Sequence, residues 1–325
     1  MKPVFYLFAA AVAIMSGAPV SAQGVESQPS SVMLDLDTGS QVATWTLSPE
    51  KPSHEAPVIF LHGGPGMYTT PGVMAKGAPL RKAGFTTIYF DQAGSGRSRR
   101  LVAKDYTIDR AIADLESLRV KLGTDKVILW GSSYGASLAT IYTTRFPDRV
   151  AGIILTSPGS YPGTNSKRDY KGTNRSKIDL SPSISVAIGK IDKQGGDAEA
   201  GLSQADAGML FDDLVNAELM GAMVCKGADL KAPPPGTGGN LYANRMISKD
   251  LDRIKFKPAA LFRIPALIVR GSCDFLPESN AAQYAKLFRT SVTAIPQSGH
   301  GLLENPSAVE NVFNAFAAGP LAAAK

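Results

Sequence analysis

The clearest pattern in this chain is a series of short, predominantly apolar runs, most of them flanked by glycine, proline or charged residues. The runs cover residues 58–61, 86–90, 127–130, 153–155, 266–269 and 292–295. Short runs without polar alternation are typical of parallel strands that are covered on both faces. Two earlier segments, residues 32–36 and 43–47, flank a turn at Thr38-Gly39 and predict an antiparallel edge.

Between these runs the apolar residues follow helical spacing. In the first such stretch one helix face would carry Ile108, Ile112, Leu115 and Leu122. Thr107 stands where it can cap that helix. Later helices are expected over residues 136–145, 281–288 and 308–316. Strands that alternate with helices predict an α/β fold with a doubly wound, mostly parallel sheet.

One long stretch interrupts this alternation. Residues 159–258 contain no clean strand, but they include a helix-like piece at 210–223 and a proline- and glycine-rich segment at 232–239. Since loops at the carboxyl ends of parallel strands are where ligands bind, we expect a helical cap over the site. The alternative is a helical excursion with no role in binding. The predicted core then comprises residues 23–158 and 259–325.

The first residues, 1–22, are typical of a signal peptide. Lys2 precedes an apolar stretch at 4–15, and Val20-Ser21-Ala22 offers small residues for cleavage after Ala22. The apolar stretch is shorter than the roughly 20 residues that cross a bilayer. We therefore expect a periplasmic or secreted protein with no stable membrane insertion after cleavage; an uncleaved anchor is the alternative.

Composition narrows the class of protein further. The 325 residues are 44% hydrophobic and 19% charged, which is typical of a globular chain. The net charge is +6, but the basic residues are scattered, so no nucleic-acid partner is expected. Cys225 and Cys273 are the two cysteines; they either pair in an oxidising compartment or remain as two buried thiols.

The strongest chemical signal is Gly131-Ser132-Ser133-Tyr134-Gly135. It follows a predicted strand and precedes a predicted helix, which is the setting of a nucleophile elbow. The turn is so tight that side chains in place of the two glycines would clash, and the serine is held in a strained conformation. Ser133 is therefore the expected nucleophile. A plain glycine–serine turn is the alternative.

A serine hydroxyl needs a base that removes its proton. Of the three histidines, His54 lies before the core, His62 follows the first core strand, and His300 follows a late strand. Because the order in this kind of fold is serine, acid, histidine, His300 is the expected base. Asp274 is the expected acid, with Glu278 as the nearest substitute.

An oxyanion hole completes the predicted site. The loop His62-Gly63-Gly64-Pro65-Gly66 follows the first parallel strand, and its glycines let backbone N–H groups approach a developing negative charge. We expect the N–H of Gly64, or of Gly63, to act with the N–H of Tyr134. His62 is expected to brace the loop rather than to transfer a proton.

These motifs together resemble the proline iminopeptidase family of α/β-hydrolases. The resemblance rests on residues 62–66, on Asp91-Gln-Ala-Gly-Ser-Gly-Arg-Ser98, on residues 131–135, and on the late segments 271–274 and 298–300. It implies the α/β-hydrolase fold and the removal of N-terminal residues, often proline, from peptides and amides. Ala93 stands where the family usually has arginine, and Tyr134 where it commonly has tryptophan.

The resemblance also implies acidic cap residues that hold the substrate's amine. Asp212, Asp213 and Glu218 are candidates, and Glu218, Gly63 and Gln92 are the predicted substrate contacts. An Asp91–Arg97 pair is expected to fix the loop beside the nucleophile.

The expected function is acyl transfer through Ser133, Asp274 and His300 on a small peptide, amide or ester substrate. The sequence predicts no metal site and no organic cofactor, since three dispersed histidines offer no metal-ligand spacing. An esterase or lactonase with the same triad is the second reading. A non-catalytic ligand binder that retains the fold is the third.

Overall fold

The computed structural model of the chain describes residues 30–163, 180–194, 201–228, 238–258 and 261–323. The predicted signal peptide, residues 1–22, and residues 232–237 of the proline- and glycine-rich segment lie outside the described residues.

Within the described residues, eight strands form one sheet in the order β1-β2-β4-β3-β5-β6-β7-β8. The strands are β1 (Val32–Asp35), β2 (Gln41–Leu47), β3 (Val58–Leu61), β4 (Thr87–Phe90), β5 (Val127–Ser132), β6 (Val150–Thr156), β7 (Ala266–Gly271) and β8 (Val292–Ile295). The β1–β2 and β2–β4 pairs are antiparallel, and every later pair is parallel. The predicted mostly parallel sheet is confirmed.

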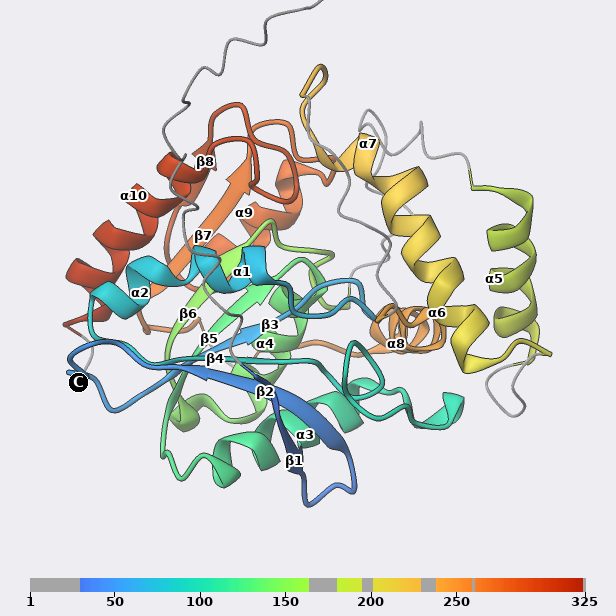
Figure 1. Ribbon diagram of the computed structural model, residues 1–325. Coiled ribbons are helices and arrows are strands. Elements are labelled where there is room, and N and C mark those ends of the chain that lie inside the picture. The colour runs from blue at the N-terminus through green and yellow to red at the C-terminus, as the bar shows by residue number, and fades with distance from the viewer. Residues whose placement is uncertain (1–29, 164–179, 195–200, 229–237, 259–260, 324–325) are drawn as a thin grey trace, which may run out of the picture.

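Helices cover both faces of this sheet (Figure 1). They are α1 (Pro71–Lys76), α2 (Ala78–Lys82), α3 (Ile108–Lys121), α4 (Tyr134–Arg145), α9 (Glu278–Leu287) and α10 (Pro306–Phe316). Shorter helical turns are η1 (Ala103–Asp105), η2 (Pro147–Arg149) and the π-helical η5 (Ala317–Leu321). Thr107 caps α3 as expected, since its hydroxyl accepts from the N–H of Arg110 at 3.1 Å.

The double covering explains the uninterrupted apolar runs. In β5, Val127 and Leu129 belong to the apolar cluster that α3 and α4 share, whereas Ile128 and Trp130 belong to the cluster on the opposite face. There the Trp130 ring meets Phe313 of α10 edge to face, with ring centroids 5.2 Å apart. Both alternating sets of side chains are therefore buried, and no polar period appears in the sequence.

The described parts of the segment between β6 and β7 are mainly helical. It contains α5 (Pro182–Gln194), α6 (Gln204–Asp213), the π-helical η4 (Leu214–Leu219), α7 (Met220–Met223) and α8 (Leu241–Arg253). Figure 1 shows α5 to α8 gathered on one side of the sheet, and they fall within the predicted cap, residues 159–258. The path from α6 through η4 to α7 includes the helix-like residues 210–223.

Polar contacts attach these helices to the core. The carboxylate of Asp250 in α8 accepts from the N–H of Ile108 at the start of α3, at 2.8 Å. The side-chain amide of Asn240 donates to the carbonyl of Gly94 at 2.7 Å, and the Arg100 guanidinium donates to the carbonyl of Gly239 at 2.8 Å. The helical segment thus lies against the loops that leave the carboxyl end of the sheet.

Candidate active site

Ser133 occupies a sharp turn between β5 and α4. Its backbone has φ 53° and ψ −119°, a conformation that side-chain-bearing residues rarely adopt. A methyl group on Gly131 would overlap the carbonyl oxygen of Gly135, and one on Gly135 would overlap the carbonyl oxygen of Leu61 in β3. Both glycines are therefore required by backbone contact, as the elbow predicted.

Hydrogen bonds from the neighbouring strand hold this turn. The N–H of Ser133 donates to the carbonyl of Thr156 at the end of β6, at 3.0 Å. The carbonyl of Ser133 accepts from the N–H of Gly159, also at 3.0 Å. These two hydrogen bonds hold the strained backbone of Ser133 in place at the carboxyl edge of the sheet.

The structure brings the predicted acid and base together. Nδ1 of His300 lies 2.9 Å from Oδ1 of Asp274, and the same oxygen accepts from the N–H of Leu276 at 2.9 Å. Burial would raise the pKa of Asp274, but the His300 ring and the Leu276 N–H outweigh it and lower that pKa. The carboxylate is therefore charged and can hold the imidazole in one orientation.

Ser133 and His300 are each placed at the end of parallel strands, but no hydrogen bond joins their side chains among the residues described. The His300 side chain is largely buried, and the ring of Phe275 packs against it with centroids 4.7 Å apart. Catalytic hydrogen bonds are often long without substrate and tighten when it binds. The Ser133–His300 contact therefore stays a prediction.

The glycine loop after β3 lies against the nucleophile. A methyl group on Gly63 would come 2.9 Å from Cβ and 3.6 Å from Oγ of Ser133. Gly64 has φ 109°, which favours glycine. Tyr134 begins α4, and the first N–H groups of a helix have no partner within it. Gly63 and the N–H of Tyr134 therefore lie beside Ser133, and Gly64 follows Gly63 in the same loop. The role of these groups as oxyanion donors stays a prediction.

His62 braces this loop, as its position suggested. Its Nε2 accepts from the N–H of Gln92 at 2.9 Å, and the Gln92 side-chain amide donates to the His62 carbonyl at 3.0 Å. Burial lowers the pKa of His62 to about 4, so the ring is neutral. Gln92 was predicted to touch substrate; in the structure its amide N–H group is used in this brace.

The expected pairing of Asp91 with the Arg97 side chain needs a correction. The Asp91 carboxylate accepts from two backbone groups, the N–H of Thr69 at 2.7 Å and the N–H of Arg97 at 2.8 Å. The Arg97 guanidinium instead lies over the Trp45 ring, 5.9 Å from its centroid. Asp91 fixes the loop, but it does so through backbone donors, which side-chain charge alone does not reveal.

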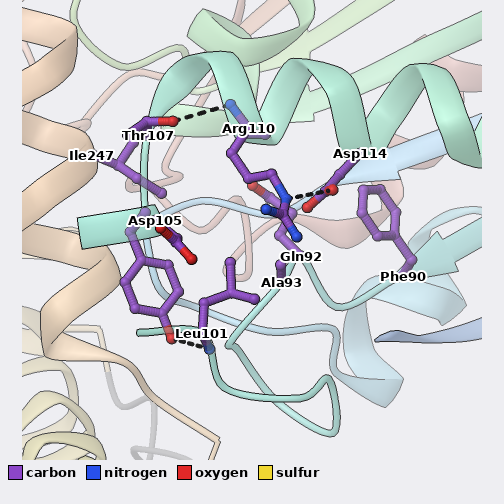
Figure 2. A pocket seen from close by; sticks show the side chains of 11 residues that line it. Phe90, Gln92, Ala93, Leu101, Asp105, Thr107, Arg110, Asp114 and Ile247 are labelled. Carbon is purple, nitrogen blue, oxygen red and sulfur yellow. Dashed lines mark hydrogen bonds and ion pairs between the residues drawn. The ribbon is translucent and has the colours of Figure 1, made fainter. Parts of the chain in front are cut away.

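A small cavity lies beneath the loop that carries Gln92 and Ala93. Figure 2 shows its lining side chains, among them Arg110 directed toward Asp114 in an ion pair of 3.2 Å. Its volume is about 20 Å³, which is room for roughly one water molecule. A hollow of about 250 Å³ is lined by residues of α5 and α8, such as Lys249, and by Tyr106 and Thr107 just before α3. Ser133 lines neither space.

The remaining candidates lie in or beside the cap. The side chain of Glu218, a predicted substrate contact, lies outside the described residues. Asp212 is buried, and its carboxylate accepts from the N–H of Gly239 at 3.3 Å. Asp213 is exposed. In the described ranges, no three His, Cys, Asp or Glu side chains gather in the way a metal ion needs.

Sequence reasoning missed one group beside the site, formed by Glu304 and the cap residues 223–225. Cys225 and Cys273, whose pairing the sequence left open, are joined by a disulfide. The carboxylate of Glu304 accepts from the N–H of Cys225 and of Gly299. The cysteine pair, with Cys273 directly before Asp274, was the available signal, but the sequence could not show that the two sulfurs approach.

Comparison with known proteins agrees with this architecture. Residues 56–179 match the family model described as the alpha/beta hydrolase fold. That match covers β3 to β6 together with the Ser133 turn, and the sheet order and parallel pairing extend the same architecture through β8.

The chain has the α/β-hydrolase fold.

Sequence relatives of the chain are named proline iminopeptidases. The chain is 35% identical to the proline iminopeptidase of Thermoplasma volcanium over 32% of its own length and 35% of the relative's. It is 36% identical to a probable proline iminopeptidase of Streptomyces coelicolor over 42% of its own length and 41% of the relative's. The predicted resemblance is confirmed, and these matches span about a third to two fifths of the relatives.

Structural likeness extends over more of the chain at lower identity. An esterase from Exiguobacterium antarcticum has a TM-score of 0.61 at 15% identity, covering 88% of this chain and 98% of that one. This likeness supports the fold, and the fold by itself does not decide the reaction. In the described part of the chain, no helix is long and apolar enough to cross a bilayer.

Proposed function

We propose that this α/β-hydrolase is an exported serine hydrolase of the proline iminopeptidase type, which releases N-terminal residues from small peptides or amides. The observation that carries the proposal is the hydrogen bond of 2.9 Å between Asp274 and His300, at the same sheet edge as the strained Ser133. An orienting acid, a base and a serine held in a sharp turn are the parts that nucleophilic catalysis needs.

In the proposed reaction, Oγ of Ser133 attacks the substrate carbonyl while His300 takes its proton. Asp274 holds the imidazole and stabilises its charged form. The N–H groups of Gly64 and Tyr134 donate to the oxyanion. His300 then gives the proton to the leaving amine, and water releases the acyl group by the same steps.

The similarity to proline iminopeptidases supports the aminopeptidase assignment, and one observation supports a second candidate, an esterase or lactonase. Burial raises the pKa of Asp212, and its carboxylate already accepts from the N–H of Gly239. The Asp212 side chain is also buried, which limits the access of a substrate amine to it. An ester or lactone needs no such anchor.

Export is supported by the Cys225–Cys273 disulfide, because disulfides persist in oxidising compartments. The intact mass of the protein purified from its native compartment tests this part. A mass that corresponds to a chain beginning at Gln23 supports export with cleavage after Ala22, and a mass that corresponds to a chain retaining Met1 contradicts it.

A substrate panel tests the reaction. Wild type and Ser133→Ala are compared on prolyl and alanyl arylamides and on short acyl esters. Turnover of the arylamides by wild type alone supports the aminopeptidase. Ester turnover without arylamide turnover favours the second candidate, and equal rates for both proteins would remove Ser133 from the mechanism.

A further inference from the structure

Residues 223–225, at the end of α7, lie directly against the loop that carries His300. The N–H of His300 donates to the carbonyl of Met223 at 2.6 Å. A methyl group on Gly299 would overlap that same carbonyl oxygen and would lie 2.6 Å from Cα of Val224. Glycine at position 299 therefore permits two backbones, one from the cap and one from the core, to touch beside the histidine.

Glu304 makes a second link between the same two segments. Its Oε1 accepts from the N–H of Cys225 at 2.8 Å and from the N–H of Gly299 at 3.0 Å, and Oε2 also accepts from Gly299 at 3.0 Å. Burial would raise the pKa of Glu304, but these backbone donors outweigh it and lower that pKa. One charged carboxylate thus bridges the cap segment and the histidine loop.

The disulfide makes a third link, this time to the loop that carries the acid. Cys225 is bonded to Cys273, which immediately precedes Asp274. The N–H of Cys273 in turn donates to the carbonyl of Ser298 at 2.9 Å, so the acid loop is also tied to the histidine loop. Both cysteines are partly exposed, which leaves the bond accessible to a small reductant.

We propose that residues 223–225 form a strap that positions His300 and Asp274 through Glu304 and the Cys225–Cys273 disulfide, and that the disulfide form is the reactive form. The inference rests on the proposed function, because it concerns the same pair of side chains. Glu304 is a positioning residue: its carboxylate touches backbone groups of the strap and the histidine loop.

A dithiol reductant would break the link to the acid loop. Two electrons and two protons pass to the two sulfurs, the S–S bond becomes two thiols, and the reductant becomes a disulfide. Asp274 then follows a residue that is no longer fixed to the strap. Misplacement of a catalytic group by about 1 Å costs on the order of 100-fold in rate, so a measurable loss is expected.

The test measures how fast a fluorophosphonate probe labels Ser133. The protein is compared oxidised, after reduction with dithiothreitol, and as the double variant Cys225→Ser/Cys273→Ser, with thiol titration and circular dichroism on each sample. Reduced wild type and the double variant are expected to react about 10- to 100-fold more slowly while remaining folded. Reoxidation should restore wild type alone.

Glu304→Gln tests the strap while the disulfide stays intact, with Glu310→Gln as its control. Glu310 is an exposed glutamate that pairs with Lys82 at 3.1 Å. Glutamine keeps one acceptor oxygen at position 304 but loses the second acceptor and the charge. We therefore expect slower labelling, together with a shifted midpoint of the acidic limb of the pH–rate profile. Glu310→Gln should match wild type in both readouts.

The outcomes separate the two proposals. If oxidised wild type is not labelled, the proposed function fails, and the strap proposal fails with it because it rests on that function. A different result would overturn the strap while the proposed function stands. In that result oxidised wild type is labelled, and neither full reduction, verified by titration of two thiols, nor Glu304→Gln changes the labelling rate or the pH midpoint. If reduction unfolds the chain, the Glu304→Gln rate and midpoint alone decide.

Discussion

The buried ring of His62 makes the stability of this protein depend on pH in a specific window. The side chain is 2% exposed, and burial lowers its pKa from 6.5 to about 4. The geometry gives the same result, because Nε2 accepts from the N–H of Gln92 at 2.9 Å and cannot do so once it is protonated. The folded state therefore requires the neutral ring.

The sign and size of the effect follow from these two pKa values. Between pH 6.5 and 4, His62 is mostly protonated in the unfolded chain and mostly neutral in the folded chain, so acid favours unfolding. The contribution of His62 is fully present above pH 6.5 and is lost as the pH falls. A shift from 6.5 to about 4 corresponds to about 3 kcal/mol in total, with about 2 kcal/mol lost by pH 5.

Urea unfolding at several pH values measures this loss. His62→Gln can still accept from the Gln92 N–H but does not titrate, so its free energy of unfolding should fall less than that of wild type between pH 7 and pH 5, by about 2 kcal/mol. His54, which stacks on Phe85 with ring centroids 3.7 Å apart, gives the control: His54→Gln should behave like wild type. Equal acid losses in wild type and His62→Gln would refute the reasoning.

Three further predictions concern the site and the core. Gly63→Ala places a methyl group 2.9 Å from Cβ of Ser133 and should slow fluorophosphonate labelling by roughly 100-fold; labelling at the wild-type rate would contradict it. Asp274→Asn removes the charge that orients the histidine and should lower kcat on the best panel substrate by on the order of 10³- to 10⁴-fold, and a loss below tenfold would speak against the triad. Phe313→Ala removes the ring that packs on Trp130 and should cost about 3–5 kcal/mol in urea unfolding, whereas a loss under about 1 kcal/mol would show that the core repacks.

The sheet could be predicted because its strands are buried on both faces. A run such as residues 127–130 offers no polar face, and a parallel strand between two helical layers is the structure that tolerates this. The elbow was predictable for a similar reason. A side chain at Gly131 would overlap the backbone of Gly135, and one at Gly135 would overlap the neighbouring strand β3. Because the first of these contacts lies within the turn itself, the local sequence carries much of the information.

Contacts between distant segments were harder to foresee. Glu304 bridges Gly299 and Cys225, and the second of these depends on how the cap lies against the core. Asp91 was expected to pair with a guanidinium, but backbone N–H groups supply its donors. The sequence lists charged side chains but does not show which backbone groups a fold presents to them.

The cap gave the weakest prediction. Helix-like pieces were expected there, but residues 210–223 were the one piece given bounds, whereas the structure has α5, a path through α6, η4 and α7, and α8. Short cap helices are stabilised by packing on one another and on the core, for example by the Arg245–Asp192 ion pair of 2.8 Å between α8 and α5. Such stabilisation leaves little trace in the local sequence.

The most direct measurement is peptide mapping of the fluorophosphonate adduct by mass spectrometry, on wild type and on His300→Ala. A single phosphonylated residue at position 133, formed rapidly in wild type and at least about 100-fold more slowly without the imidazole, is the predicted result. Modification at another residue, or equal rates for the two proteins, would contradict the claim that one base activates one serine at the edge of this sheet.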